Sequence, residues 1–177
     1  MLNYFRLFFD LCLFRQPAAN VPKSDTLLLV TAGAAIISGA INIIPDYRVS
    51  GALLVSTIQV LFFALVIGVT LLLRGRMERW VQTTTGIYGA ITILQLLTIP
   101  LSGWHARLLA PDLAVMIVTI PLIAIAGISV WTLAVTASIL RQAMQIPIIA
   151  AVLIIIGSQA ALLMLVFVIA TPIVGPL

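Results

Sequence analysis

The sequence predicts an all-α membrane protein: a bundle of five transmembrane helices preceded by a short N-terminal amphipathic helix at the membrane interface. The chain of 177 residues is 63% hydrophobic and only 8% charged, whereas a soluble domain averages about 25% charged residues. Five apolar segments are each long enough to cross a hydrocarbon core about 30 Å thick. Basic residues gather on one side of these segments. These observations predict a single integral membrane domain, residues 1–177.

Residues 1–22 are predicted to form the interfacial helix and a linker. Within residues 2–14, Asn3, Arg6 and Asp10 fall on one polar stripe, and most of the remaining surface is apolar. A helix of this composition is not stable alone in water, so it either lies in the interface or docks under the bundle. Two prolines then break the helix before the first span.

The predicted spans are bounded by charged residues and prolines. They cover residues of about 26–45, 50–73, 82–101, 112–140 and 146–171. Pro100 closes the third span, and an outer loop follows from Ser102 to Ala110. A fourth span that begins near Asp112 is longer than a bilayer needs, and Pro121 predicts a kink within it.

Small residues stand four positions apart in three of the predicted spans. Such pairs let two helix backbones approach closely, which is a main source of packing energy in lipid. The pairs are Ala35 and Gly39, Gly86 and Ala90, and Gly157 and Ala161. These are the candidate helix-packing residues, and for the pair in the first span we expect packing within the chain, with a dimer face as the alternative.

Basic residues indicate how the chain threads the membrane. Seven of the nine fall on one set of alternate connections: Arg6, Arg15, Lys23, Arg74, Arg76, Arg79 and Arg141. Only Arg48 and Arg107 fall on the other set. Because basic residues beside spans stay in the cytoplasm, we expect an integral protein of the bacterial inner membrane with a cytoplasmic N-terminus and a C-terminus outside. The dispersed charges form no patch for nucleic acid. The expected partners are the lipid bilayer and either a membrane protein or a second copy in a homo-oligomer.

Few side chains are of the kinds that perform catalysis. The one histidine, His105, and the one cysteine, Cys12, are predicted on opposite faces of the membrane and cannot form a nucleophile–base pair. A metal site needs three or four ligands, and Asp46, His105 and Asp112 have no spacing that suggests one. We therefore expect no catalytic, cofactor-binding or metal-binding residues, and a protein that is not an enzyme.

The predicted spans contain uncharged polar residues but no charge near their middle, which disfavours a proton-coupled transporter. Gln59, Gln95 and Gln159 lie away from the ends of their spans. They either hydrogen-bond between helices, at about 0.6–2 kcal/mol each, or line a small polar cavity. Trp131 lies deep in the fourth span, and a span glutamine is the natural partner for its indole N–H.

Three stretches of the chain carry a resemblance to a known family. They are the apolar start from Phe8 to Phe14, the run Gln82-Thr83-Thr84-Thr85-Gly86, and Trp131-Thr132-Leu133 in a long fourth span that contains a proline. With the short turn and last span that follow, the chain resembles the Yip family of small five-span membrane proteins over most of its length. The resemblance implies a helical, non-enzymatic membrane protein that acts through partner proteins or lipids, and it transfers no functional residue.

The sequence leaves two functions open. We expect a non-enzymatic accessory or scaffold subunit that acts through helix packing with partner proteins or lipids. The alternative is a transporter or channel-like protein for a small neutral solute, which would use Gln59, Gln95 and Gln159. Replacing all three glutamines by leucine separates the two, because a packing role predicts altered stability alone and a pore role predicts lost flux.

Overall fold

The computed structural model describes residues 2–44, 48–108 and 119–174, and every element that these residues form is a helix. Five of these helices are long and apolar enough to cross a membrane. They are α2 (Asp25–Ile43), α3 (Val49–Leu73), α4 (Trp80–Leu108), α5 (Ile120–Met144) and α6 (Ile148–Val174). The chain is therefore a helical, multi-pass integral membrane protein.

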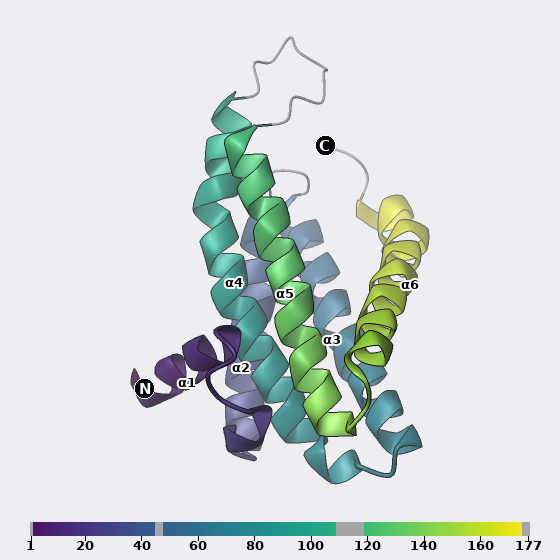
Figure 1. Ribbon diagram of the computed structural model, residues 1–177. Helices are drawn as coiled ribbons and strands as arrows, with labels where there is room; N and C mark the ends of the chain where they lie inside the picture. Colours follow the sequence, from purple (N-terminus) through teal and green to yellow (C-terminus); the bar gives the residue numbers. More distant parts are fainter. Residues whose placement is uncertain (1, 45–47, 109–118, 175–177) are drawn as a thin grey trace.

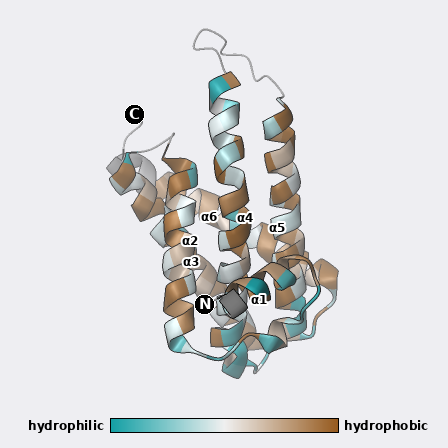
Figure 2. Ribbon diagram, turned by 90° about the vertical axis from the view of Figure 1, so that its left-hand side faces the viewer, coloured by the Kyte–Doolittle hydropathy of each residue, from teal (hydrophilic) through white to brown (hydrophobic). Residues whose placement is uncertain are grey.

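The five long helices run side by side, and consecutive helices point in opposite directions (Figure 1). α4 packs most extensively against α2 and α5, while α3 packs on α2 and α6 packs on α5 and α3. The turns after α3 and α5 meet at one end of the bundle, together with the linker before α2. We call this end the basic end because it carries Arg74, Arg76, Arg79 and Arg141. Hydrophilic residues gather there, whereas apolar residues dominate the middle of the helices (Figure 2).

Local signals explain where the helices begin and end. Ser24 caps α2, since its Oγ accepts a hydrogen bond of 3.3 Å from the backbone N–H of Leu27. After α3 the chain reverses at Gly75, whose φ of 63° suits a residue without a Cβ. A short 3-10 turn, η2 (Met77–Arg79), then leads into α4. α5 ends at Gln145, which also adopts a left-handed conformation, with φ of 54°.

The structure corrects the predicted spans at two prolines. Pro100 lies inside α4, which continues to Leu108, so the predicted closure at Pro100 and the loop from Ser102 are wrong. Proline is tolerated within membrane helices because neighbouring groups satisfy the freed carbonyl. Pro121 lies in the first turn of α5 and produces no kink, since a missing N–H costs nothing at that position. The predicted start near Asp112 falls outside the described residues.

The N-terminal helix α1 (Leu2–Cys12) lies across the flank of the bundle, against α4 and α5 (Figure 1). Phe8 and Cys12 are buried against the bundle, whereas Phe5 is 60% exposed. A 3-10 turn, η1 (Ala18–Asn20), then joins α1 to α2. The helix thus docks beside the bundle, and its predicted place at the membrane interface stays a prediction.

Two of the three small-residue pairs lie inside the bundle. Ala35 is buried in α2, and a Cβ on Gly39 would lie 3.2 Å from the Ser56 Oγ of α3, so the two helices approach closely there. Gly86 and Ala90 are buried in α4. These positions hold the centre of the bundle together.

The third pair lies on the outside of the bundle. Gly157 and Ala161 lie on the exposed face of α6. A Cβ on Gly157 would meet nothing within 4 Å. The face around them contacts no other described helix, so it is available to lipid or to another protein.

Candidate functional site

A cavity of about 600 Å³ lies between α3, α4, α5 and α6, near the middle of each helix. Ligand sites typically have volumes of about 300–1,000 Å³ and apolar walls with a few polar groups. Aliphatic residues and Phe63 form most of this wall, and none of the described residues that line it is charged. The polar lining residues are Asn42, Gln59, Gln95, Thr98, Ser102, Ser129, Thr132, Thr136 and Gln159. We call this space the central cavity.

The three glutamines that stand out in the sequence all line the central cavity. Gln59 comes from α3, Gln95 from α4 and Gln159 from α6. They are separated by 36 and 64 positions in the chain, and the antiparallel arrangement of the helices brings them to one level. Their hydrogen bonds, however, divide them into two kinds.

Gln95 belongs to a hydrogen-bonded clamp between α2 and α4. Its Oε1 accepts a bond of 2.7 Å from Ser38 Oγ, and its backbone oxygen accepts one of 3.1 Å from Asn42 Nδ2. Asn42 Oδ1 in turn accepts a bond of 2.8 Å from Thr98 Oγ1. We call these four residues the α2–α4 clamp. Because its side-chain and backbone oxygens accept bonds from Ser38 and Asn42 of α2, Gln95 stabilises the packing of α2 on α4.

Gln59 and Gln159 differ from Gln95 because their side-chain amides form no hydrogen bond with any other described residue. An amide without a partner in an apolar medium costs roughly 2–7 kcal/mol. Both amides border the central cavity, Gln59 from α3 and Gln159 from α6. They therefore remain available to water or to a ligand in that space.

The hydroxyl groups of α5 complete the polar part of the wall. Ser129, Thr132 and Thr136 each donate to the carbonyl oxygen four residues earlier, at 2.9, 2.8 and 2.7 Å. Because each hydroxyl has a single proton, these residues offer only acceptor lone pairs to the cavity. The amide nitrogens of Gln59 and Gln159 supply donors. The site can thus satisfy a neutral group that both donates and accepts, such as a hydroxyl or a carboxamide.

Trp131 does not bond to a span glutamine, contrary to the prediction. Its Nε1 donates a hydrogen bond of 2.9 Å to the backbone oxygen of Cys12. Its ring also meets Phe14 edge-on, with centroids 5.6 Å apart. The last carbonyls of a helix lack partners within the helix, and Trp131 supplies one at the end of α1. The tryptophan therefore anchors α1 and does not line the central cavity.

Gly89 is a second residue that holds α1 in place, and the sequence did not single it out. A Cβ at this position would lie 2.3 Å from the Phe8 ring, so only glycine allows the ring to pack on α4. Beside it, Cys12 Sγ donates to the Ala90 oxygen at 3.6 Å. Burial raises the pKa of the Cys12 thiol to about 11. The thiol is thus a packed side chain that stays protonated near neutral pH.

The histidine and the acidic residues lie apart. His105 Nδ1 is 2.7 Å from Thr119 Oγ1, at the end of the bundle opposite the basic end. Within the described ranges, no three residues among histidine, cysteine, aspartate and glutamate come close enough to hold a metal ion. Asp46 and Asp112 lie outside those ranges.

Comparisons of the chain with protein-family models, with curated proteins and with solved structures find no match. The resemblance to the Yip family therefore stays a prediction. The central cavity and its two unpartnered amides carry the functional argument.

Proposed function

We propose that this chain is a non-enzymatic multi-pass membrane protein that binds a small neutral amphiphile in the central cavity. The observation that supports this function best is the pair of unpartnered amides, Gln59 of α3 and Gln159 of α6, which both line the central cavity. Polar groups in lipid ordinarily pair with one another. Their lack of a partner across a cavity of ligand size favours an occupant that supplies one.

The chemistry of the wall defines the occupant. Among the described residues, no charged side chain lines the central cavity, so an ionised ligand would lose its hydration without compensation from them. The aliphatic wall suits a short hydrocarbon body, and the amides suit one hydroxyl or carboxamide group. Binding of this kind is the first step of the transporter or channel-like function, for which flux in reconstituted vesicles is the further readout.

Photolabelling tests the proposal directly. The purified protein in vesicles of neutral phosphatidylcholine is exposed to octanol that carries a diazirine, irradiated, and digested for mass spectrometry. We expect adducts on cavity residues such as Ile128 and Ile155, in excess over lipid-facing Leu163, and competition by unlabelled octanamide. A diazirine-bearing octane is the control and should show no such excess. Adducts spread evenly over lipid-facing residues, or equal labelling by both probes, would refute a polar ligand site.

A second candidate function, the accessory or scaffold subunit, is favoured by the exposed face of α6. We propose that Gly157 and Ala161 form the contact of this chain with a membrane protein or a second copy, since close helix approach in lipid uses such pairs. Gly157→Leu should abolish the complex captured by cross-linking in native membranes. Gly127→Leu is the matched control, because a Cβ on Gly127 also meets nothing within 4 Å. Equal loss in both variants would contradict a specific α6 contact.

We also propose that the basic end faces the cytoplasm of a bacterial inner membrane, with the C-terminus outside. The support is the charge distribution: the turns after α3 and α5 carry Arg74, Arg76, Arg79 and Arg141. Basic residues near spans resist translocation. In this orientation α1 enters from the cytoplasmic side.

A further inference from the structure

A smaller pocket of about 150 Å³ lies at the basic end, apart from the central cavity. We call it the basic pocket. Its walls come from η1, the start of α4 and the end of α5. The side chains that matter for its chemistry are Arg79, Gln82, Thr83 and Gln142. No carboxylate lines it within the part of the chain that the structure describes.

Thr83 is an unpartnered hydroxyl in this wall. The residue is only 2% exposed, and its side chain forms no hydrogen bond with any other residue in the described part of the chain. Threonines in helices usually donate to the carbonyl one turn back, as Thr85 does to Val81 at 2.7 Å. The buried hydroxyl of Thr83 therefore has its bonding capacity free for an occupant of the basic pocket.

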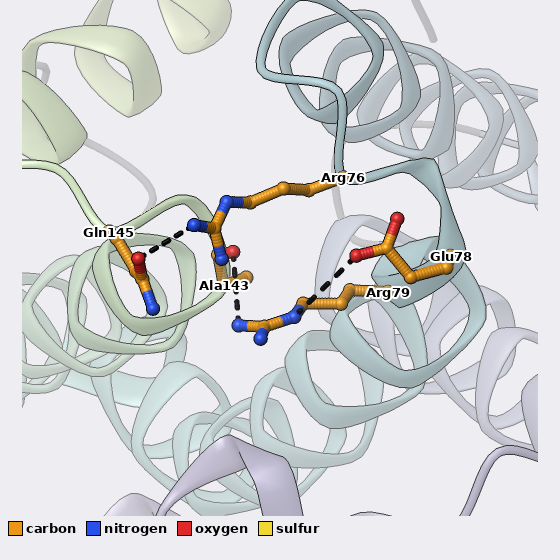
Figure 3. Close-up of polar contacts among 5 residues, drawn as sticks. All are labelled: Arg76, Glu78, Arg79, Ala143 and Gln145. Carbon is orange, nitrogen blue, oxygen red and sulfur yellow. Dashed lines mark hydrogen bonds and ion pairs between the residues drawn. The ribbon is translucent and has the colours of Figure 1, made fainter.

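Arg79 supplies a positive charge, and its guanidinium makes only long contacts with neighbouring groups. Its Nη1 lies 3.5 Å from the Ala143 oxygen, and its Nε lies 3.9 Å from a Glu78 carboxylate oxygen (Figure 3). Both contacts are at the long limit for such interactions. A guanidinium has five N–H donors, so most of those on Arg79 remain free. Glu78 is largely exposed and competes only weakly.

The remaining polar groups fix the walls. Gln82 Nε2 donates to the backbone oxygens of Ala19 and Val21, at 2.6 and 2.7 Å. Gln142 Oε1 accepts a bond of 3.0 Å from the Ala18 N–H. These bonds tie η1 to α4 and α5. They use both N–H groups of Gln82, so Arg79 and Thr83 are the residues whose donors remain free to face the pocket.

We propose that the basic pocket binds a phosphate group, held by the Arg79 guanidinium and the Thr83 hydroxyl. Arginine pairs with phosphate through parallel, charge-assisted hydrogen bonds. The amino end of α4 adds a positive dipole beside the same two residues. A phosphate group reaches this place either as the headgroup of an anionic phospholipid or as free phosphate, and the pocket chemistry is the same for both.

The test measures thermal unfolding of the full chain in neutral detergent with two probes, dihexanoyl phosphatidylglycerol and inorganic phosphate. We expect a concentration-dependent rise in the melting temperature. Thr83→Val, which keeps the side-chain shape, should weaken the apparent affinity about fivefold, and Thr83→Ser should restore it. Arg79→Gln should weaken it tenfold or more. Arg74→Gln, in the same turn but outside the pocket, is the matched control and should bind normally.

Each outcome bears on the proposal. A shift with the lipid alone identifies a headgroup site, a shift with inorganic phosphate alone identifies a free-phosphate site, and a shift with both supports the shared chemistry. No shift with either probe would overturn the proposal. So would an equal loss of binding in Arg74→Gln, because that result would reduce the effect to diffuse surface charge. If Arg79→Gln does not fold, the comparison of Thr83→Val with Thr83→Ser still tests the proposal.

Discussion

At the residue scale, the surroundings of each glutamine decide what it does. Gln95 lies in the α2–α4 clamp, where Ser38 and Asn42 satisfy its polar groups. Gln59 and Gln159 border the central cavity without a partner among the described residues. The sequence identified all three as residues away from span ends. It could not separate them, because the difference depends on which helix lies beside each one.

Leucine substitutions should reveal this difference as opposite effects on stability. Gln95→Leu removes the acceptor for Ser38 and should destabilise the folded protein by about 1–2 kcal/mol. Gln59→Leu replaces an unpaired amide by an apolar group and should be neutral or stabilising. Thermal unfolding in detergent measures both. The assignment fails if Gln59→Leu is as destabilising as Gln95→Leu.

Gly89 is the residue on which the packing of α1 against α4 depends most. In Gly89→Ala the new Cβ would overlap the Phe8 ring, so α1 should shift and expose the Cys12 thiol. Burial raises the thiol pKa to about 11, so ionisation at pH 8 is suppressed in the native protein. Release of α1 should lower that pKa and speed maleimide labelling at pH 8 several-fold.

Gly127→Ala is the control for this substitution, since its Cβ meets nothing within 4 Å. It should label Cys12 at the native rate. The proposed role of Gly89 is wrong if Gly89→Ala and Gly127→Ala give the same labelling rate.

At the element scale, apolar run length predicts helices well where charge or glycine ends the run. α2 and α3 begin and end within about two residues of the predicted spans 26–45 and 50–73. The errors occur at Pro100, at Pro121 and at Arg141, since α5 continues through Arg141 to Met144 although the predicted span ended at 140. Hydropathy alone does not tell whether a proline lies within a membrane helix or in its first turn, because that depends on whether neighbouring groups satisfy the freed carbonyl. The flank position of α1 depends on Gly89 and Trp131, which are distant in sequence.

The turn between α5 and α6 predicts how substitutions at the end of α5 change the melting temperature. Gln145 has φ of 54°, which costs a non-glycine residue about 1 kcal/mol, and its Oε1 accepts a bond of 2.6 Å from Arg76 (Figure 3). An exposed bond of this kind contributes well under about 1 kcal/mol. Gln145→Gly should therefore raise the melting temperature, whereas Gln145→Ala should lower it. A melting temperature that falls equally in both variants would show that the Arg76 contact outweighs the backbone cost.

At the scale of the whole molecule, the basic end and the central cavity are separate features. The charges gather at the turns, and no charged side chain in the described ranges lines the cavity. Charge distribution along the sequence predicts how the chain threads the membrane, and that orientation stays a prediction. The sequence predicted a polar cavity only as an alternative, because the existence of the cavity depends on how α6 packs against α3 and α5.

Reporter fusions test the threading in a bacterial host. Alkaline phosphatase fused after Leu177 should be active, because the C-terminus is proposed to lie outside, and a fusion after Arg76 should be inactive. Green fluorescent protein at the same two positions should give the reverse pattern. Active phosphatase at Arg76 would place the basic end outside and contradict the proposed orientation.

The most direct measurement of the central claim compares photolabelling of the cavity by the diazirine-bearing octanol and octane in a double variant, Gln59→Leu with Gln159→Leu. Loss of two hydrogen bonds predicts that the preference for the alcohol, about threefold to tenfold in the native protein, disappears. Gln145→Leu makes the same substitution outside the cavity and should keep the preference. An undiminished preference for the alcohol in the double variant would contradict the claim that these two amides bind the ligand.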